Sequence, residues 1–536
     1  MSLCSFDIGG WSHHSTVSLG STLPSAPDSA SWPQMSRFYQ FTVSTLRFIV
    51  RRYFREVEVI GLEHLPEDGG GMLVSWHPNG MIDPGLILTH FPRQVIFGAR
   101  DGLFRWPGLG WMMKKMGAVP IYRAMDQQRA DPEARRKANN KSLNALASAV
   151  AEGRYSCLFP EGDSHDSSNL LDLKTGAARF YYQARKLKTE GSEDPVIIPV
   201  GLHYDAKRTF RSSVLIAFHP PISLSEYLES LPEPDEPPQL LKERYRALTT
   251  EIERVLREVV HATESWDLHY LMHRVRKLSR AERGVRAGAE LDKPMMAERT
   301  LAFARVWAGY YTRLESHPAQ VAGLRARLSE YDQDLRALGL EDHELDKPPR
   351  LASPWLAAIL ALQVVLVFFL LPPILLVGYI INLPPALGLL ALSKKFSQRR
   401  KDESSIKLMF GVIAFPATWL AAGIGAGLTH RWLHELFPRI PDTPILAGLV
   451  MMLLAIVGGM VALRYIRLAR ETGRAVRIRL TRARRRLALA RLRVERSELY
   501  DAIMMLVGDL DLPGAVRPDG KIVSDEQNQG EKGWLK

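Results

Sequence analysis

The chain has 536 residues, of which 46% are hydrophobic and 24% are charged, and this composition excludes a wholly disordered chain, a collagen-like repeat and a pure coiled coil. Its 70 Lys and Arg residues outnumber 58 Asp and Glu residues, which gives a net charge of +12, and a length of this size predicts about three or four domains. The only cysteines are Cys4 and Cys157, which excludes a disulfide-built scaffold and a zinc site made of cysteines.

The first 55 residues change in character at residue 37. Residues 1–36 are rich in Ser and Pro and contain no continuous apolar run, so we expect a disordered tail and no secretory signal. Residues 37–55 combine aromatic and aliphatic residues with arginines and predict an amphipathic helix. Two interpretations stay open for this helix: it lies on an anionic membrane surface, or it packs against the domain that follows.

Residues 56–231 form the predicted catalytic domain, because short β-rich runs alternate there with helical stretches. This alternation predicts an α/β sheet covered on both faces. Ligand sites in such sheets lie at strand ends, in the loops that lead into helices. The expected strands are residues 57–60, 71–76, 94–99, 119–122, 155–159, 196–202 and 214–218, and the expected helices are residues 83–90, 103–116, 131–152 and 175–187.

One of these loops carries a histidine and an aspartate at its two ends. An apolar strand ends at His77, a Pro-Asn-Gly turn follows, and Asp83 stands at the start of a helix. The turn can bring the two side chains together. A carboxylate on one imidazole nitrogen fixes the tautomer, and the other nitrogen can then take a proton from a hydroxyl. A purely structural hydrogen bond within the turn is the alternative.

A second loop, residues 158–165, again follows an apolar strand and contains Pro-Glu-Gly. His165 and Asp166 form a second possible acid–base pair, which we rank below His77. Arg123 ends another predicted strand, where a guanidinium can bind a phosphate with two hydrogen bonds. For a single arginine, a surface salt bridge is the alternative.

Together these pieces resemble the glycerolipid acyltransferase family, which includes glycerol-3-phosphate and 1-acylglycerol-3-phosphate acyltransferases. The resemblance covers residues 55–220 and rests on His77 with Asp83, Gly117 followed by Arg123, the Phe-Pro-Glu-Gly loop of residues 159–162, and the apolar strand of residues 196–200. Most of the family has four residues between the His and the Asp, whereas five stand here. That spacing is similar to the glycerol-3-phosphate/dihydroxyacetone-phosphate acyltransferase branch known from fungi.

The resemblance implies a fold and a set of roles. The fold is a mixed α/β sheet flanked by helices, followed by a helical extension and C-terminal membrane helices. His77 is the general base and Asp83 orients it. No metal and no other cofactor is required, because acyl-CoA or acyl carrier protein brings the acyl group. The implied substrate-binding residues are Arg123, Arg100 and Lys174 for the phosphate, with Glu161 and Gly162 shaping the acceptor site.

The second half of the chain predicts a helical extension and a membrane region. Residues 239–350 are helical and charged, and they either pack on the catalytic domain or act as a spacer. Residues 351–463 contain three apolar stretches, and spanning a bilayer takes roughly 20 such residues. Two proline pairs in residues 351–393 predict a tight hairpin or a re-entrant segment. Buried helices of a soluble protein are the alternative.

Basic segments set the expected orientation. The loop of residues 394–407 has six Lys and Arg residues against two acids, which places it in the cytoplasm. Residues 464–500 predict a basic juxtamembrane helix, since Arg464–Arg496 holds 13 Arg and two Glu. Anionic lipid is the expected partner of this helix, with nucleic acid as the weaker alternative. Residues 501–536 form the predicted C-terminal tail.

We therefore expect an integral membrane acyltransferase of phospholipid synthesis with its catalytic domain on the cytoplasmic side. It would transfer a fatty acyl group from acyl-CoA or acyl carrier protein to glycerol 3-phosphate. An alternative within the same class is the acylation of 1-acylglycerol 3-phosphate, a lysophospholipid. An alternative of another class is an inactive membrane scaffold that keeps the fold. Besides these substrates, the expected partners are anionic membrane lipids, and no nucleic acid is expected.

Overall fold

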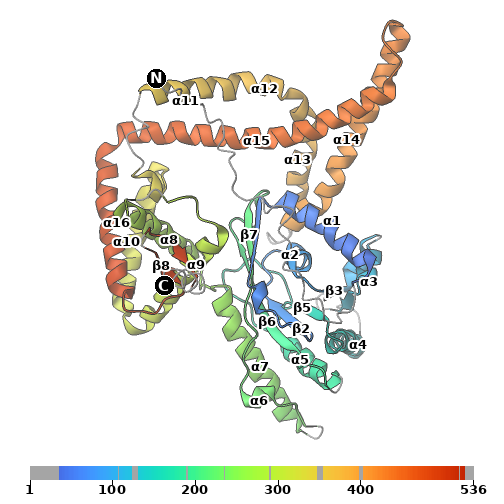
Figure 1. Cartoon of the computed structure of the whole chain (residues 1–536), viewed down its shortest axis with the longest axis vertical. Coiled ribbons are helices and arrows are strands. Elements are labelled where there is room, and N and C mark those ends of the chain that lie inside the picture. The colour runs from blue at the N-terminus through green and yellow to red at the C-terminus, as the bar shows by residue number, and fades with distance from the viewer. Residues whose placement is uncertain are drawn as a thin grey trace, which may run out of the picture.

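The computed structural model places a sheet-containing domain beside a bundle of helices, with long apolar helices above both (Figure 1). Of the predicted tails, residues 1–36 and 501–536, residues 1–34 and 525–536 lie outside the part that it describes, whereas residues 501–507 continue a helix and residues 515–523 form a hairpin. The described residues are 35–106, 108–122, 131–188, 191–233, 236–288, 291–346, 354–396, 403–517 and 519–524.

The catalytic domain is built on a seven-stranded sheet with the order β1-β7-β6-β2-β5-β3-β4. Only β6 and β7 pair in antiparallel fashion, and the other pairs are parallel. The predicted α/β class with a mixed sheet is therefore confirmed. The strands are β1 Glu56–Ile60, β2 Gly71–Ser75, β3 Val95–Arg100, β4 Val119–Ile121, β5 Tyr155–Leu158, β6 Val196–Tyr204 and β7 Ser213–Phe218.

Helices cover both faces of this sheet because successive strand residues point to opposite sides. In β2, Met72 and Val74 belong to a core shared with α4, α5 and α7, whereas Leu73 belongs to a core shared with α1 and α2. The helices of the domain are α1 Arg37–Tyr53, α2 Ile82–His90, α3 Leu109–Lys115, α4 Pro132–Ala151, α5 Gly176–Leu187, α6 Glu226–Glu229 and α7 Pro238–Val259.

The expected helix of residues 103–116 is in fact two elements. A 3₁₀ turn covers Asp101–Arg105, and α3 begins only at Leu109. Gly108 lies between them with φ of +79°, a left-handed conformation that interrupts a right-handed helix and that glycine adopts at little cost.

The first helix, α1, packs on the sheet and exposes apolar residues as well. Tyr39 and Tyr53 are buried, and the backbone N–H of Val95 donates a 2.9 Å hydrogen bond to the Tyr39 hydroxyl. On the opposite side, Phe41 and Phe48 are 71% and 59% exposed. One face of α1 therefore packs on the domain, as the second interpretation predicted. The other face exposes apolar residues that can contact a membrane surface.

The helical extension packs on the catalytic domain, which excludes the simple spacer. Glu58 in β1 accepts hydrogen bonds of 2.7 and 2.8 Å from the N–H groups of Met296 and Ala297, at the start of α9. Trp307 donates a 2.7 Å hydrogen bond to the carbonyl of Ala262. The extension comprises α8 Trp266–Arg286, α9 Met296–Ser316 and α10 Pro318–Leu338, joined by α16 Arg486–Val507 and the β8–β9 hairpin, Ala515–Val516 and Ile522–Val523.

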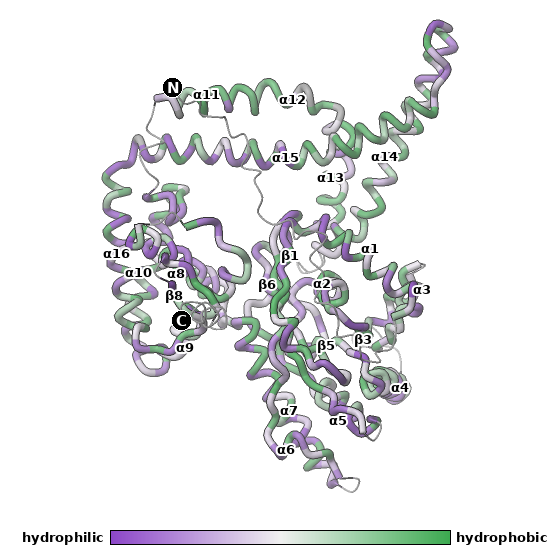
Figure 2. The backbone as a smooth tube through the Cα atoms, in the orientation of Figure 1, coloured by the Kyte–Doolittle hydropathy of each residue, from purple (hydrophilic) through white to green (hydrophobic). Residues whose placement is uncertain are grey.

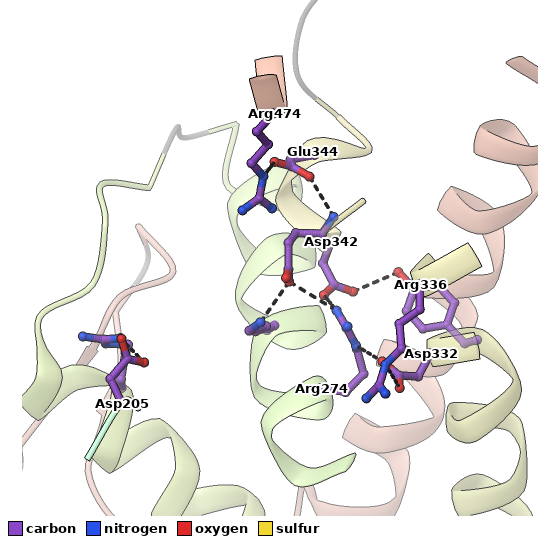
Figure 3. A network of polar contacts seen from close by, with 11 residues as sticks. Asp205, Arg274, Asp332, Arg336, Asp342, Glu344 and Arg474 are labelled. Atoms are coloured by element: carbon purple, nitrogen blue, oxygen red, sulfur yellow. Dashed lines mark hydrogen bonds and ion pairs between the residues drawn. The ribbon is translucent and has the colours of Figure 1, made fainter. Parts of the chain in front are cut away.

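A network of buried charges ties the extension to the arginine-rich segment (Figure 3). Arg274 lies 2.5 Å from Asp332 and 2.6 Å from Asp342, and Arg474 lies 2.9 Å from Glu344. Arg496 is only 1% exposed. Its guanidinium lies 2.9 Å from Glu282 and also contacts Asp346.

This network corrects the expected role of residues 464–500 in part. The segment is divided between α15 Pro444–Arg484 and α16, with a break at Arg485. Arg496 is buried against Glu282 and is therefore not available to lipid, whereas Arg474 pairs with Glu344 but stays half exposed. The reason is that Glu282 and Glu344 are buried and require cationic partners.

In the part of the chain that the structure describes, two helices are long and apolar enough to cross a membrane, Glu403–Leu436 and Pro444–Arg482. They belong to α14 Glu403–Leu436 and to α15, and Figure 2 shows long hydrophobic stretches along both. Leu420, Leu428 and Leu453 are 57%, 65% and 60% exposed, so these are not core helices of a soluble domain. Contiguous apolar surface of this kind needs lipid, and we conclude that the protein is membrane-associated.

The stretch before α14, expected to form a tight hairpin or a re-entrant segment, turns at the first proline pair and continues as a helix through the second. It contains α11 Pro354–Val365, the π-helix Leu366–Leu370, α12 Leu371–Ile374 and α13 Leu376–Phe396. The first proline pair lies in α12, where the chain turns toward α13 (Figure 1). The second pair, Pro384-Pro385, lies inside α13 without ending it. Prolines are tolerated in helices whose neighbours satisfy the freed backbone groups, and α13 packs against both α14 and α15.

Candidate active site

The centre of the site is an imidazole–carboxylate pair at the carboxyl end of β2. The chain leaves β2 after Ser75 and enters α2 at Ile82, and the turn between them folds His77 toward Asp83. Nδ1 of His77 lies 2.8 Å from Oδ2 of Asp83. The Asp83 side chain is fully buried, whereas that of His77 is 19% exposed. The expected proximity is therefore present, with the histidine on the accessible side.

Two further donors hold the Asp83 carboxylate in place. The backbone N–H of Asn79 donates a 2.7 Å hydrogen bond to Oδ2, and the phenol of Tyr204 donates to Oδ1. Burial, and then the carboxylate of Asp83, raise the pKa of Tyr204 well above its ordinary value. The phenol therefore stays protonated and remains a donor at neutral pH, when Asp83 is an acceptor.

This arrangement assigns the tautomer of His77. Because the buried carboxylate accepts from Nδ1–H, the lone pair of the ring is on Nε2, which makes no hydrogen bond within the described part of the chain. Phe159 stacks on the ring with a centroid distance of 4.2 Å and an angle of 15°. The ring is thus fixed in orientation and presents one proton acceptor to an incoming hydroxyl.

Glu161 joins the two motif loops from inside the protein. Its side chain is fully buried and accepts hydrogen bonds of 2.9 Å from the His77 N–H and 3.0 Å from the Leu171 N–H. Nε2 of His165 donates at 2.6 Å to Oε1, the oxygen that also accepts from the Leu171 N–H. Glu161 therefore shapes the site by holding loops together. Both of its oxygens are buried and occupied by these donors, so they are not open to a substrate.

The second acid–base pair does not form. Nδ1 of His165 accepts a 3.1 Å hydrogen bond from the Ser167 N–H, so both ring nitrogens are occupied. Asp166 faces away from this histidine and pairs with Lys207 at 2.6 Å and with Arg208. His165 is therefore a structural residue that supports the loop.

Of the three predicted phosphate-binding residues, the structure describes Lys174 and Arg100. Lys174 is exposed, and its side chain folds over Gly162, where an added Cβ would lie 2.5 Å from Nζ. Gly162 has φ of +71°, so the turn itself needs a left-handed residue. Arg100 is exposed at the end of β3. Arg123 lies outside the described residues.

Three positions that hold the site were not identified from the sequence. Tyr204 is the last residue of β6, the strand next to β2 in the sheet. Its position at a strand end is the one feature of the sequence that could have indicated a role in the site. Ser404 and Ser405 begin α14: Ser405 accepts a 3.0 Å hydrogen bond from the Met81 N–H, and Ser404 donates a 2.8 Å bond to the carbonyl of Lys207. No sequence pattern around these serines links them to the site, because their partners lie in a distant part of the sequence.

We also looked for a metal site and for a cysteine nucleophile in the described part of the chain. Among the residues that the structure describes, no group of three or more His, Cys, Asp or Glu side chains could hold a metal ion. Cys157 is buried in β5, and burial raises the pKa of its thiol well above the ordinary value, with Asp83 as a second cause. A thiolate nucleophile is therefore disfavoured at this position.

Comparison with known proteins agrees with the motif resemblance. Residues 56–203 match the model of the Acyltransferase family. Glycerol-3-phosphate O-acyltransferase 2 of Saccharomyces cerevisiae is 25% identical over 188 residues, which are 35% of this chain and 23% of the yeast protein. A chloroplastic 1-acyl-sn-glycerol-3-phosphate acyltransferase of Arabidopsis thaliana is 27% identical over 146 residues, 27% of this chain and 38% of that protein.

A solved structure is also similar. The 1-acyl-sn-glycerophosphate acyltransferase of Thermotoga maritima shares 18% identity and covers 41% of this chain and 80% of its own, with a TM-score of 0.28 that supports no conclusion. The matched part of this chain spans about a quarter of the length of the yeast relative. The match of residues 56–203 to the Acyltransferase family model confirms the resemblance for the catalytic domain.

Proposed function

We propose that this protein is a membrane-bound acyltransferase that transfers a fatty acyl group from a thioester to the hydroxyl of glycerol 3-phosphate. The single observation that carries the proposal is the His77–Asp83 pair at 2.8 Å, with Asp83 buried and Nε2 of His77 left as the proton acceptor. The match of residues 56–203 to the Acyltransferase family supports the reaction class.

The chemistry follows from this pair. Nε2 of His77 takes the proton of the acceptor hydroxyl while the hydroxyl oxygen attacks the thioester carbonyl. The tetrahedral intermediate collapses, the C–S bond breaks, and the leaving thiolate receives the proton from His77. Asp83 stabilises the imidazolium between these steps. A positioned base of this kind contributes roughly 10² to 10⁴ in rate.

The acceptor is proposed from charge as well as from similarity. Lys174 lies over Gly162, in the loop that also carries Phe159 against the His77 ring. We infer that this ammonium, together with Arg123 and Arg100, binds the phosphate of the acceptor. The donor is acyl-CoA or acyl carrier protein. The yeast relative is named a glycerol-3-phosphate O-acyltransferase, which favours the first acylation step.

The second candidate is acylation of 1-acylglycerol 3-phosphate, and the named activity of the Arabidopsis relative supports it. Both candidates place the site near the membrane surface on the cytoplasmic side. What supports this placement is the contact of Ser405, at the start of the apolar helix α14, with Met81 in the catalytic turn. An outside-restricted thiol probe that modified a cysteine placed at Asp166 but left one placed at Pro438 unmodified would contradict the orientation.

The test is an assay of the purified full chain in detergent or vesicles with a labelled acyl donor. Glycerol 3-phosphate, dihydroxyacetone phosphate and 1-acylglycerol 3-phosphate are offered in parallel. We expect the highest kcat/KM with glycerol 3-phosphate, and we expect His77→Ala to abolish transfer while the protein stays folded. Transfer to none of the acceptors by the wild-type chain would instead support an inactive scaffold.

A further inference from the structure

A cavity lies inside the helical extension, outside the catalytic domain. Its volume is about 310 Å³, and it is enclosed by α8, α9, α10 and α16 together with the C-terminal hairpin. Volumes of roughly 300 to 1,000 Å³ are typical of small-molecule sites. Nothing in the proposed acyl transfer uses this space.

The interior of the cavity is apolar. Leu271 and Met272 of α8 line it from one side, and Val306 of α9 and Ile503 of α16 line it from others. Val516 of the hairpin closes one end. A chain of methylene groups fits such a surface, whereas a nucleotide or a sugar would leave its polar groups without partners.

Among the described residues, all the charged side chains that line the cavity are arginines, and no Asp, Glu or Lys lines it. Two of the four are held by backbone oxygens: Arg283 donates to the carbonyl of Gly520 at 3.1 Å, and Arg305 donates to that of Pro513 at 2.9 Å. Arg325 is exposed. The positive charge around an apolar interior therefore has no acidic counterpart at the cavity wall.

Arg276 differs from the other arginines of its helix. It makes no hydrogen bond or ion pair within the described part of the chain, and its buried Nε lacks a partner. By contrast, Arg274 and Arg280 on the same helix each pair with an acid. Burial, and then the charge of Arg299, lower the pKa of Arg276 to about 10 against the opposite effect of Asp205 and Glu298, so the guanidinium is charged at neutral pH. An anion in the cavity would give this guanidinium a direct hydrogen-bond partner.

We propose that this cavity binds a single-chain anionic lipid, with the acyl chain in the apolar interior and a carboxylate or phosphate head group on Arg276. The charge of the wall and the apolar lining both favour this ligand. The membrane is a source of it, because the arginine-rich end of α15 connects the apolar part of that helix to α16. This site is separate from the catalytic pair and does not depend on the proposed transfer reaction.

The test is photoaffinity labelling of the full chain in detergent, followed by mass-spectrometric mapping of the labelled peptides. The probes are dodecanoate, 1-dodecanoylglycerol 3-phosphate and neutral dodecanol, each with a diazirine in the chain. We expect both anions to label α8, α9 and α16 at least tenfold more than dodecanol does. Preference between the two anions distinguishes a free fatty acid from a lysophospholipid.

Variants locate the two halves of the ligand. Arg276→Gln should lower labelling of the bundle about tenfold, while Arg276→Lys should retain most of it because it keeps the charge. Ala302→Phe, which places a ring inside the cavity, should abolish labelling. Arg246→Gln, an exposed arginine of α7, is the matched control and should change nothing. Circular dichroism checks that each variant is folded.

Labelling confined to the catalytic domain would overturn the proposal, as would equal labelling by dodecanol or labelling unaffected by Arg276→Gln and Ala302→Phe. The experiment is repeated in the His77→Ala background, where labelling of the bundle should persist. Failure of the cavity site and failure of the proposed acyl transfer are therefore observed separately.

Discussion

The phenol of Tyr204 donates a hydrogen bond to Oδ1 of Asp83, the carboxylate whose other oxygen faces the ring of His77. The tyrosine comes from the end of β6 and the aspartate from the start of α2. The orientation of the candidate base is therefore set by the sheet as well as by its own turn.

Tyr204→Phe should lower kcat roughly tenfold with little change in the KM for the acceptor, because it leaves a buried carboxylate oxygen without its donor. Steady-state kinetics measures both constants. The control is Tyr182→Phe, which removes another buried hydroxyl, bonded at 2.8 Å to the carbonyl of Leu228. Equal losses of kcat in both variants would show that the effect is general destabilisation.

Asp83→Asn should lower kcat by roughly 10² to 10⁴ while the variant stays folded. An amide has the same shape, but its NH₂ group cannot accept a hydrogen bond, so the side chain no longer fixes the tautomer of His77. Single-turnover measurements of acyl transfer test this expectation. Asp332→Asn, at a buried carboxylate of the helical extension, should reduce stability but leave the chemical step unchanged. Near-normal transfer by Asp83→Asn would remove the aspartate from the mechanism.

Gly162→Ala should raise the KM for the phosphate-bearing acceptor, because its methyl group would displace the ammonium of Lys174. Gly153→Ala is a matched control: it has φ of +88° and open space around an added Cβ, so it carries only the backbone cost of about 1 to 2 kcal/mol. Lys174→Gln should reproduce the effect on KM. An unchanged KM in Lys174→Gln would exclude this lysine from phosphate binding.

Arg496→Met should lower the free energy of unfolding of the extension by about 1 to 3 kcal/mol, because the buried Glu282 loses this partner and keeps only its contact with Arg286. Thermal unfolding followed by circular dichroism measures the change in Tm. Arg491→Met, at a side chain that is 68% exposed, should cost about 0 to 1 kcal/mol. If the two variants unfold alike, the buried network does not hold the bundle together.

Acid should weaken the junction between the catalytic domain and the extension. Burial lowers the pKa of His261 to about 3 and that of His269 to about 4. Between pH 6.5 and 4 the unfolded chain therefore binds protons that the folded chain does not, so stability falls as the pH falls through this window and is constant above it. Urea unfolding at pH 7.5, 5.5 and 4.5 measures the slope.

The slope should be smaller in His261→Gln and in His269→Gln, since each removes one group that titrates only on unfolding. His317→Gln, at an exposed position, should leave the slope unchanged. A slope that is the same in all three variants would assign the acid sensitivity to other groups.

The strands of the catalytic domain were predictable because each is an apolar run bounded by Gly, Pro or polar residues. Their ends in the structure differ by no more than two residues from the expected ones. The His77–Asp83 contact was predictable for a similar reason, since a single turn joins its two ends. The loop of Glu161 was also identified, but the burial of this side chain was not, because burial depends on how two loops pack.

Contacts across long separations were not predictable. Tyr204 lies 121 residues from Asp83, and Ser405 lies 324 residues from Met81. A single hydroxyl side chain forms no recognisable sequence pattern, so the roles of Tyr204 and Ser405 become visible only in the folded structure. The arginine-rich segment shows the same limit, because its composition is typical of a lipid-facing helix, whereas the buried acids that pair with Arg474 and Arg496 lie elsewhere in the chain.

The contacts of Ser404 and Ser405 have a consequence for any shortened version of this protein. A fragment that ends before the apolar helices keeps His77, Asp83 and the whole sheet, yet it lacks the hydroxyls that meet the Met81 N–H and the Lys207 carbonyl. Water would replace them, and the turn between β2 and α2 would lose its outer support. The catalytic domain is therefore not a self-contained unit, because the apolar helix α14 supports the turn that carries His77 and Asp83.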